Sequence, residues 1–119
     1  MKTKLPEKSK VINEIIANFK KRTSDFYGMR LHSLVLYGSY ARGDFRKGSD
    51  IDILVVLDSI ESEMNEIDNL TGIKTDLALE YEQYLSTNPV SREKYENSDF
   101  SFYRNVKQEG ILLWTIKLH

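Results

Sequence analysis

Two aspartates separated by a single residue, Asp50 and Asp52, are the side chains of this sequence best suited to carry out chemistry. Residues two apart on a β-strand project from the same face, with their Cα atoms roughly 6.5–7 Å apart. Two carboxylates in that arrangement can hold a pair of divalent cations, which two-ion sites place about 3.5–4 Å apart. Mg²⁺ is the expected ion because it prefers oxygen ligands and accompanies phosphate substrates. Asp50 and Asp52 therefore predict a metal site for two Mg²⁺ ions.

A Gly-Ser pair, Gly38 and Ser39, comes before the aspartates and is separated from them by residues 40–49. A glycine lets the backbone approach a phosphate closely, since it has no Cβ in the way. The Ser39 hydroxyl, together with the amides at the start of a following helix, can donate hydrogen bonds to phosphate oxygens. We assign Gly38, Ser39, Arg42 and Ser49 to nucleotide binding.

Three basic residues, Arg42, Arg46 and Lys47, lie in the connection between the Gly-Ser pair and the aspartates. Each of them could neutralise a polyphosphate or a leaving pyrophosphate. Each could equally be a solvated surface charge. The sequence does not show which of the three points toward a phosphate.

Two buried strands are expected to position these residues. The segment 31–37 is rich in β-forming residues and ends at Gly38, and its apolar residues occupy both faces near the end, as in a central strand. The segment 51–57 is a second apolar run. Ile51 and Ile53 alternate with the aspartates, so burying the isoleucines fixes the direction in which Asp50 and Asp52 point.

The flanking segments read as helices and a last strand. An apolar stripe with three- and four-residue steps predicts a helix over 8–22, followed by a connector over 23–30. A helix is expected over 99–109 and an edge strand over 111–116. We expect one domain over 1–119, with residues 1–8 as a flexible lead-in. The residues that form the stripe are Val11, Ile12, Ile15, Ile16 and Phe19.

The segment 58–90 allows two interpretations. In one, a helix over 60–70 stops at Thr71-Gly72 and a strand begins at Ile73, as the alternation of apolar residues up to Tyr81 indicates. In the other, which we favour, the helix continues to Tyr81 and tolerates Gly72 at a cost of about 1 kcal/mol. The strand then covers 83–87 and ends at Asn88-Pro89.

The composition is that of an ordinary globular protein, with 40% hydrophobic and 29% charged residues among 119. The 17 basic and 18 acidic side chains give a net charge of −1, which offers no basis for direct nucleic-acid binding. The chain has no cysteine, which excludes disulfides and thiolate chemistry. No apolar run reaches the ~20 residues of a membrane span, and the N-terminus does not resemble a signal peptide. We expect a cytoplasmic protein that does not enter a membrane.

The order of these motifs resembles the signature of the DNA polymerase β-like nucleotidyltransferases, and most closely that of their minimal (MNT) branch. The resemblance is carried by Gly38-Ser39, the ten residues 40–49 and Asp50-Ile51-Asp52, with a weaker likeness over 81–96. It implies an α+β fold in which helices pack on a mixed β-sheet. It also implies an enzyme that transfers a nucleoside monophosphate, with ATP as the expected donor and Mg²⁺ as the metal.

The same resemblance implies a third carboxylate on the strand after the aspartates. Under the favoured interpretation this residue is Glu82, as a metal ligand and catalytic base at the start of the strand over 83–87; under the other it is Asp76. The branch includes antitoxins that pair with HEPN-family toxins. We therefore expect AMP transfer to a hydroxyl of such a toxin, with tyrosine as the expected acceptor. The alternatives are an antitoxin that binds nucleotide and acts by occlusion without catalysis, and a nucleotidyltransferase acting on a small molecule.

Overall fold

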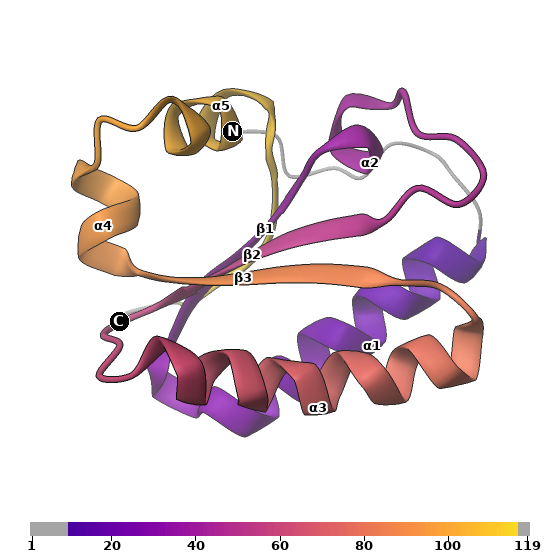
Figure 1. Cartoon of the computed structure of the whole chain (residues 1–119), viewed down its shortest axis with the longest axis horizontal. Coiled ribbons are helices and arrows are strands. Elements are labelled where there is room, and N and C mark those ends of the chain that lie inside the picture. The colour runs from indigo at the N-terminus through magenta and orange to yellow at the C-terminus, as the bar shows by residue number, and fades with distance from the viewer. Residues whose placement is uncertain (1–9, 117–119) are drawn as a thin grey trace.

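The computed structural model describes residues 10–116, and the lead-in predicted over 1–8 lies outside them. A four-stranded sheet has the order β3-β2-β1-β4, in which β1 is antiparallel to both neighbours and β2 is parallel to β3 (Figure 1). The strands are β1 (Leu31–Tyr37), β2 (Ile51–Leu57), β3 (Leu85–Ser91) and β4 (Ile111–Thr115). The helices are α1 (Lys10–Tyr27), α2 (Ser39–Arg42), α3 (Glu63–Tyr81), α4 (Arg92–Asn97) and α5 (Ser101–Glu109), with a 3-10 turn η1 (Gly28–Arg30) after α1. The predicted mixed α+β sheet is confirmed.

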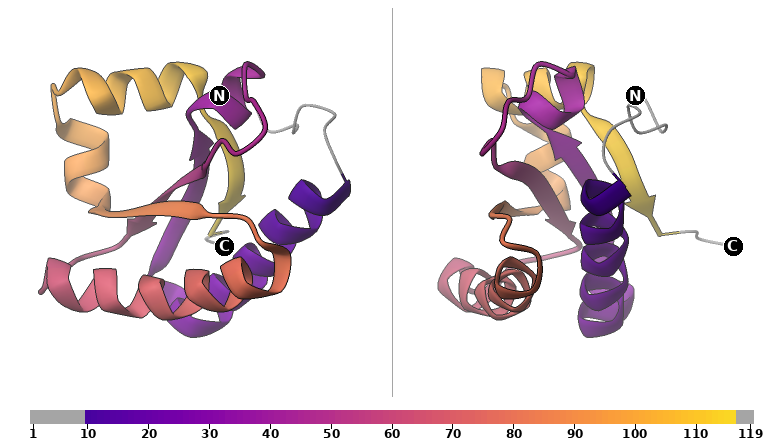
Figure 2. Two further views of the ribbon diagram at one scale, coloured as in Figure 1. Left: turned by 45° about the vertical axis from the view of Figure 1, so that its right-hand side comes forward. Right: turned by 90° about the vertical axis from the view of Figure 1, so that its right-hand side faces the viewer.

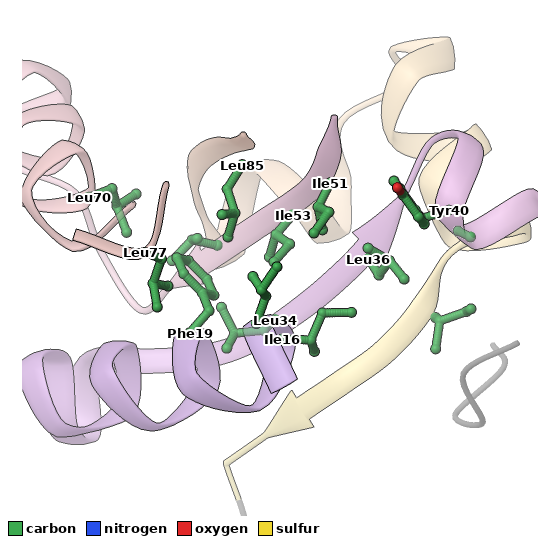
Figure 3. Packing of buried hydrophobic residues seen from close by; sticks show 14 of the residues in the cluster. Ile16, Phe19, Leu34, Leu36, Tyr40, Ile51, Ile53, Leu70, Leu77 and Leu85 are labelled. Atoms are coloured by element: carbon green, nitrogen blue, oxygen red, sulfur yellow. The ribbon is translucent and has the colours of Figure 1, made fainter. Parts of the chain in front are cut away.

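Helices α1 and α3 lie side by side on one face of the sheet (Figures 1 and 2). Figure 3 shows Phe19 of α1 and Leu70 and Leu77 of α3 packed with Ile51 and Ile53 of β2. All five side chains are buried. The isoleucines of β2 therefore face these helices, and the alternate residues of β2 must face the other side of the sheet.

The predicted first helix is correct in kind but too short. Helix α1 continues past Arg22 to Tyr27, through the segment that the sequence suggested was a connector. The buried stripe explains the extension, because Thr23 and Tyr27 follow Phe19 at four-residue steps and are also buried.

The opposite face of the sheet carries a second, smaller core beneath α4 and α5 (Figure 1). Val35, Leu54 and Val56 pack there with Tyr95 of α4 and Val106 of α5. The sequence did not predict α4, and α5 begins at Ser101 rather than at residue 99. Asp52 shares this face with Leu54 and Val56, because all three are alternate residues of one strand.

In the segment 58–90, the structure confirms the continuous helix and corrects the strand after it. Helix α3 begins at the N-cap Ser62, whose hydroxyl accepts from the Asn65 amide at 3.3 Å, and runs without a break to Tyr81. β3 starts two residues later than predicted and continues through Pro89 to Ser91. Proline is tolerated here because β3 is an edge strand, with a neighbour on only one side.

A buried polar cluster ties η1 to α3 at the end of the sheet away from the aspartates. Glu66 is only 4% exposed and accepts hydrogen bonds from the hydroxyl of Tyr27 (3.0 Å), the guanidinium of Arg30 and the amide of Asn69 (3.2 Å). Burial alone would raise the pKa of Glu66. The hydrogen bonds from Arg30, Asn69 and Tyr27 outweigh that effect and hold its pKa below the ordinary value.

Replacing Glu66 by glutamine is expected to lower the free energy of unfolding at pH 7 by about 1–3 kcal/mol, because the hydrogen-bond donors of Tyr27, Arg30 and Asn69 lose a charged acceptor that is itself buried. A carboxylate with a lowered folded-state pKa stabilises the protein above its unfolded-state pKa of ~4.3, and this contribution is lost as the pH falls through the folded-state value. The difference between the wild type and Glu66→Gln, measured by urea denaturation, should therefore shrink below about pH 4. An equal difference at pH 7 and pH 3 would show that the ionised form does not matter.

None of the helices between residues 10 and 116 is both long enough and apolar enough to cross a membrane.

Candidate active site

The two aspartates stand at the entrance to β2, on the sheet face that also carries α4 and α5. Asp52 is the second residue of the strand and is half-buried, whereas Asp50 lies just before it and is exposed. In the sheet, Asp52 pairs with Tyr37 of β1 on one side and with Ser86 of β3 on the other. The predicted orientation of the pair follows from the burial of Ile51 and Ile53 on the opposite face.

The Gly-Ser turn lies directly against the second aspartate. Gly38 has φ +73° and ψ −156°, a conformation that is open almost only to glycine. A Cβ at this position would overlap Oδ2 of Asp52. The glycine is therefore required twice, once for its backbone conformation and once for its close approach to the carboxylate.

Helix α2 begins immediately after this glycine. The carbonyl oxygen of Gly38 accepts from the amides of Ala41 (3.1 Å) and Arg42 (3.0 Å), which turns the chain into the helix. Tyr40 and Ala41 are buried, and the ring of Tyr40 stacks on Phe45 with the centroids 4.6 Å apart. The Ser39 hydroxyl forms no hydrogen bond within residues 10–116, so it is available to a ligand. A phosphate on this turn would lie beside Asp52.

The electrostatics of the pair favour a bound cation. Burial raises the pKa of Asp52 above its ordinary value, and the negative charge of Asp50 raises it further. The charge of Arg42 and the Ser86 hydroxyl act in the opposite direction and lower the pKa of Asp52. A divalent cation between the carboxylates would remove the repulsion between them, and their oxygen atoms suit Mg²⁺. The residues present therefore fit a metal ion.

Arg42 is the basic residue of the connection that acts on the aspartates. Its Nε lies 3.2 Å from Oδ2 of Asp44, and its NH1 lies 3.7 Å from Oε2 of Glu109. Its charge also lowers the pKa of Asp52. Arg46 and Lys47 are exposed and form no ion pair with another described residue. Arg42 is thus held beside the site by two acidic neighbours, and a phosphate would compete with them for its guanidinium.

Ser49 has a structural part in this loop. Its hydroxyl accepts from the Arg46 amide at 2.8 Å, and its amide donates to the Arg46 carbonyl at 2.9 Å, which closes a tight turn. The carbonyl of Ser49 also accepts from Nε2 of Gln83 at 2.8 Å. These contacts fix the backbone that leads into Asp50, and because the Ser49 hydroxyl only accepts here and still has its own proton to donate, its role in nucleotide binding stays a prediction.

Neither candidate for the third carboxylate reaches the aspartates. Glu82 caps the end of α3 with a left-handed backbone (φ +54°) and borders a groove together with Leu79 and Tyr84. Asp76 lies on α3 facing Arg22, with Oδ2 and NH1 3.5 Å apart. Within residues 10–116, no group of three or more acidic or histidine side chains could hold a metal ion. The placement of Glu82 at the start of the strand was wrong, because Glu82 caps the end of α3 and β3 begins only at Leu85.

Two residues beside Asp52 were not predicted from the sequence. Ser86 is its neighbour on β3, and Tyr37 is its neighbour on β1. The Tyr37 hydroxyl accepts from Nδ2 of Asn88 at 2.6 Å, and its ring packs edge to face on Phe102 of α5, with the centroids 5.4 Å apart. The only signal for Ser86 is strand register, which places it level with Asp52 once β3 is known to start at Leu85.

A Gly-Ser turn at the end of β1, packed against the paired carboxylates at the start of the neighbouring strand β2, is the arrangement of a nucleotidyltransferase. The model of the nucleotidyltransferase domain family matches residues 16–113, and the chain belongs to this family. The chain is similar to a candidate protein adenylyltransferase of Methanocaldococcus jannaschii, with 35% identity over 88% of this chain and 96% of that protein. The nucleotidyltransferase that the motif spacing predicted is confirmed.

Solved structures share the fold at lower identity. A toxin–antitoxin structure with AMP-PNP superimposes with a TM-score of 0.58 at 20% identity, over 84% of this chain and 73% of that one. A structure of the tri-AMPylated Shewanella oneidensis HEPN toxin in complex with its MNT antitoxin gives a TM-score of 0.51 at 18% identity, over 86% of this chain and 73% of that one.

Proposed function

We propose that this nucleotidyltransferase transfers AMP from ATP to a tyrosine hydroxyl of a partner HEPN-family toxin and so acts as its antitoxin. The observation that carries the proposal is the packing of the Gly38 turn against the Asp52 carboxylate, which would bring bound phosphates and a metal ligand together. The curated relative described above is named for protein adenylyl transfer, and the solved structures contain toxin–antitoxin pairs, AMP-PNP and an AMPylated HEPN toxin.

The chain's own groups divide the work of this reaction. The Gly38–Ser39 turn would bind the phosphates through backbone amides and the free Ser39 hydroxyl. Asp50 and Asp52 would hold Mg²⁺, which, when bound, would supply positive charge to the reacting phosphates. Arg42 would stabilise the negative charge that builds up on the leaving pyrophosphate. The new bond joins the acceptor oxygen to the α-phosphorus, the bond from the α-phosphorus to the pyrophosphate oxygen breaks, and the proton of the acceptor hydroxyl passes to solvent water.

The direct test combines the protein with Mg²⁺, α-³²P-labelled ATP and a partner protein of the HEPN family. We expect label on the partner and a mass increase of one or more AMP groups on a tyrosine. The double variant Asp50→Asn/Asp52→Asn should transfer no label. Asp76→Asn is the matched control, because it removes a carboxylate that faces Arg22 on α3, and it should transfer AMP normally. A partner that binds but gains no AMP would contradict the proposal.

A second candidate function is neutralisation by occlusion, without catalysis. It is favoured by one observation, the lack of a third acidic residue beside Asp50 and Asp52 in the described part of the chain. Toxin inhibition by the double aspartate variant separates the two functions. If inhibition is lost although the variant still binds the toxin, AMP transfer is responsible. Unchanged inhibition would support occlusion.

A further inference from the structure

The β3 position beside Asp52 carries a serine. The parallel register pairs Asp52 with Ser86, and in-register residues of neighbouring strands project from the same face of a sheet. The Ser86 hydroxyl also lowers the pKa of the Asp52 carboxyl, as expected of a hydroxyl group beside a carboxylate. Leu85 belongs to the core on the opposite face, and Thr87 alternates to that face as well. Ser86 is therefore the β3 side chain that lies next to Asp52.

No other acidic side chain in the described part of the chain substitutes for a carboxylate at the Ser86 position. β3 has the sequence LSTNPVS and carries no carboxylate at all. Glu82 borders the groove between α3 and β3 with Leu79, and Asp76 faces Arg22 on α3. Over residues 10–116, the only acidic side chains placed to share a cation at this site are Asp50 and Asp52.

Asp50 and Asp52 together carry two negative charges, which match the charge of one divalent cation. An ion that accompanies the nucleotide can complete its shell with phosphate oxygens and water, as Mg²⁺ usually does. A second ion would have to share the same two carboxylates, with only the neutral Ser86 hydroxyl on the β3 side. We infer that this chain binds one divalent cation with its nucleotide, because Ser86 occupies the β3 position from which a third carboxylate would complete a two-ion site. The inference rests on the proposed nucleotide site and differs from the two-ion prediction.

The test counts cations directly and does not depend on activity. The protein is saturated with an ATP analogue that has a methylene group between the α- and β-phosphorus, so that no AMP can be transferred. Bound Mn²⁺ is then measured by equilibrium dialysis. We expect one Mn²⁺ per complex for the wild type and two for Ser86→Asp, because the new carboxylate would lie level with Asp52. The matched control is Ser86→Asn, because asparagine has nearly the same shape as aspartate but no charge. This variant should still bind one Mn²⁺ per complex.

The number of bound Mn²⁺ ions distinguishes a one-cation site from a two-cation site. Two tightly bound Mn²⁺ ions in the wild type would overturn the one-cation inference and leave the proposed function intact. Failure to bind the analogue or any Mn²⁺ would overturn both. Circular dichroism checks that Ser86→Asp is folded, and Ser86→Glu repeats the test with a longer arm. A count of one in both folded acidic variants would show that Ser86 does not occupy the missing ligand position.

Discussion

Asp52→Asn is expected to lower the rate of AMP transfer to the partner by ~10²–10³-fold without lowering the stability of the protein. Loss of a metal ligand should remove about 3–4 kcal/mol of transition-state stabilisation, and each 1.36 kcal/mol corresponds to a factor of ten. Asparagine keeps the shape of the side chain and removes only its charge. Initial rates of labelled AMP incorporation, with saturating partner and ATP, measure the effect.

The stability of this variant separates a functional role from a structural one. The pKa of Asp52 is raised in the folded protein, chiefly by burial and then by Asp50, so at neutral pH its charge opposes folding. Removing the charge should therefore leave the Tm of the metal-free protein unchanged or higher. Such a gain is expected where a site keeps an unfavourable charge for its function. A fall in Tm that accompanies the loss of activity would instead mean that Asp52 supports the fold.

Gly38→Ala is expected to weaken binding of the ATP analogue at least tenfold and to destabilise the protein by about 1–3 kcal/mol. The backbone at Gly38 lies in a region that costs a residue with a side chain about that much. The added Cβ also overlaps Oδ2 of Asp52, so the carboxylate must leave its place beside the turn. Calorimetric titration with the analogue and urea denaturation measure the two effects separately.

Gly28→Ala is the matched control for this variant. Gly28 also has a positive φ, +56°, but its Cβ would have no other atom within 4 Å, and it lies in η1, away from the aspartates. We expect a smaller loss of stability and an unchanged affinity for the analogue. Equal affinities of Gly38→Ala and the wild type would show that the contact between the turn and Asp52 is not needed for nucleotide binding.

The close contact between the turn and the carboxylate depends on the pairing of β1 with β2. Antiparallel register sets Tyr37 opposite Asp52, so the residue that follows Tyr37 meets the start of the next strand. The residues between the two strands form α2 and a loop, which Tyr40, Phe45 and Ser49 hold in place. The Gly-Ser turn and the pair of aspartates lie at opposite ends of the connection between β1 and β2, and the pairing of these two strands brings them together.

The class of chemistry and most of the secondary structure can be predicted from the amino-acid sequence. Gly38-Ser39 and Asp50-Ile51-Asp52 are local signals, since each group's function depends on residue types a few positions apart on elements whose apolar pattern is clear. The buried faces of β2, α1 and α3 follow from the same periodicity. The continuous helix across Gly72 was predicted correctly. The first helix was predicted to end at Arg22, whereas α1 continues to Tyr27.

The residue that lies beside the aspartates on β3 could not be predicted from the sequence, because it depends on how the strands pair. The register between β2 and β3 sets which residue of β3 lies beside Asp52. Because β3 starts at Leu85 and not at Gln83, that residue is Ser86. Short polar segments such as residues 82–91 leave their ends poorly defined in sequence, because no strong apolar alternation marks where helix stops and strand begins. Pairing with Ile51–Leu57 fixes those ends, and it places Ser86, not Glu82, next to Asp52.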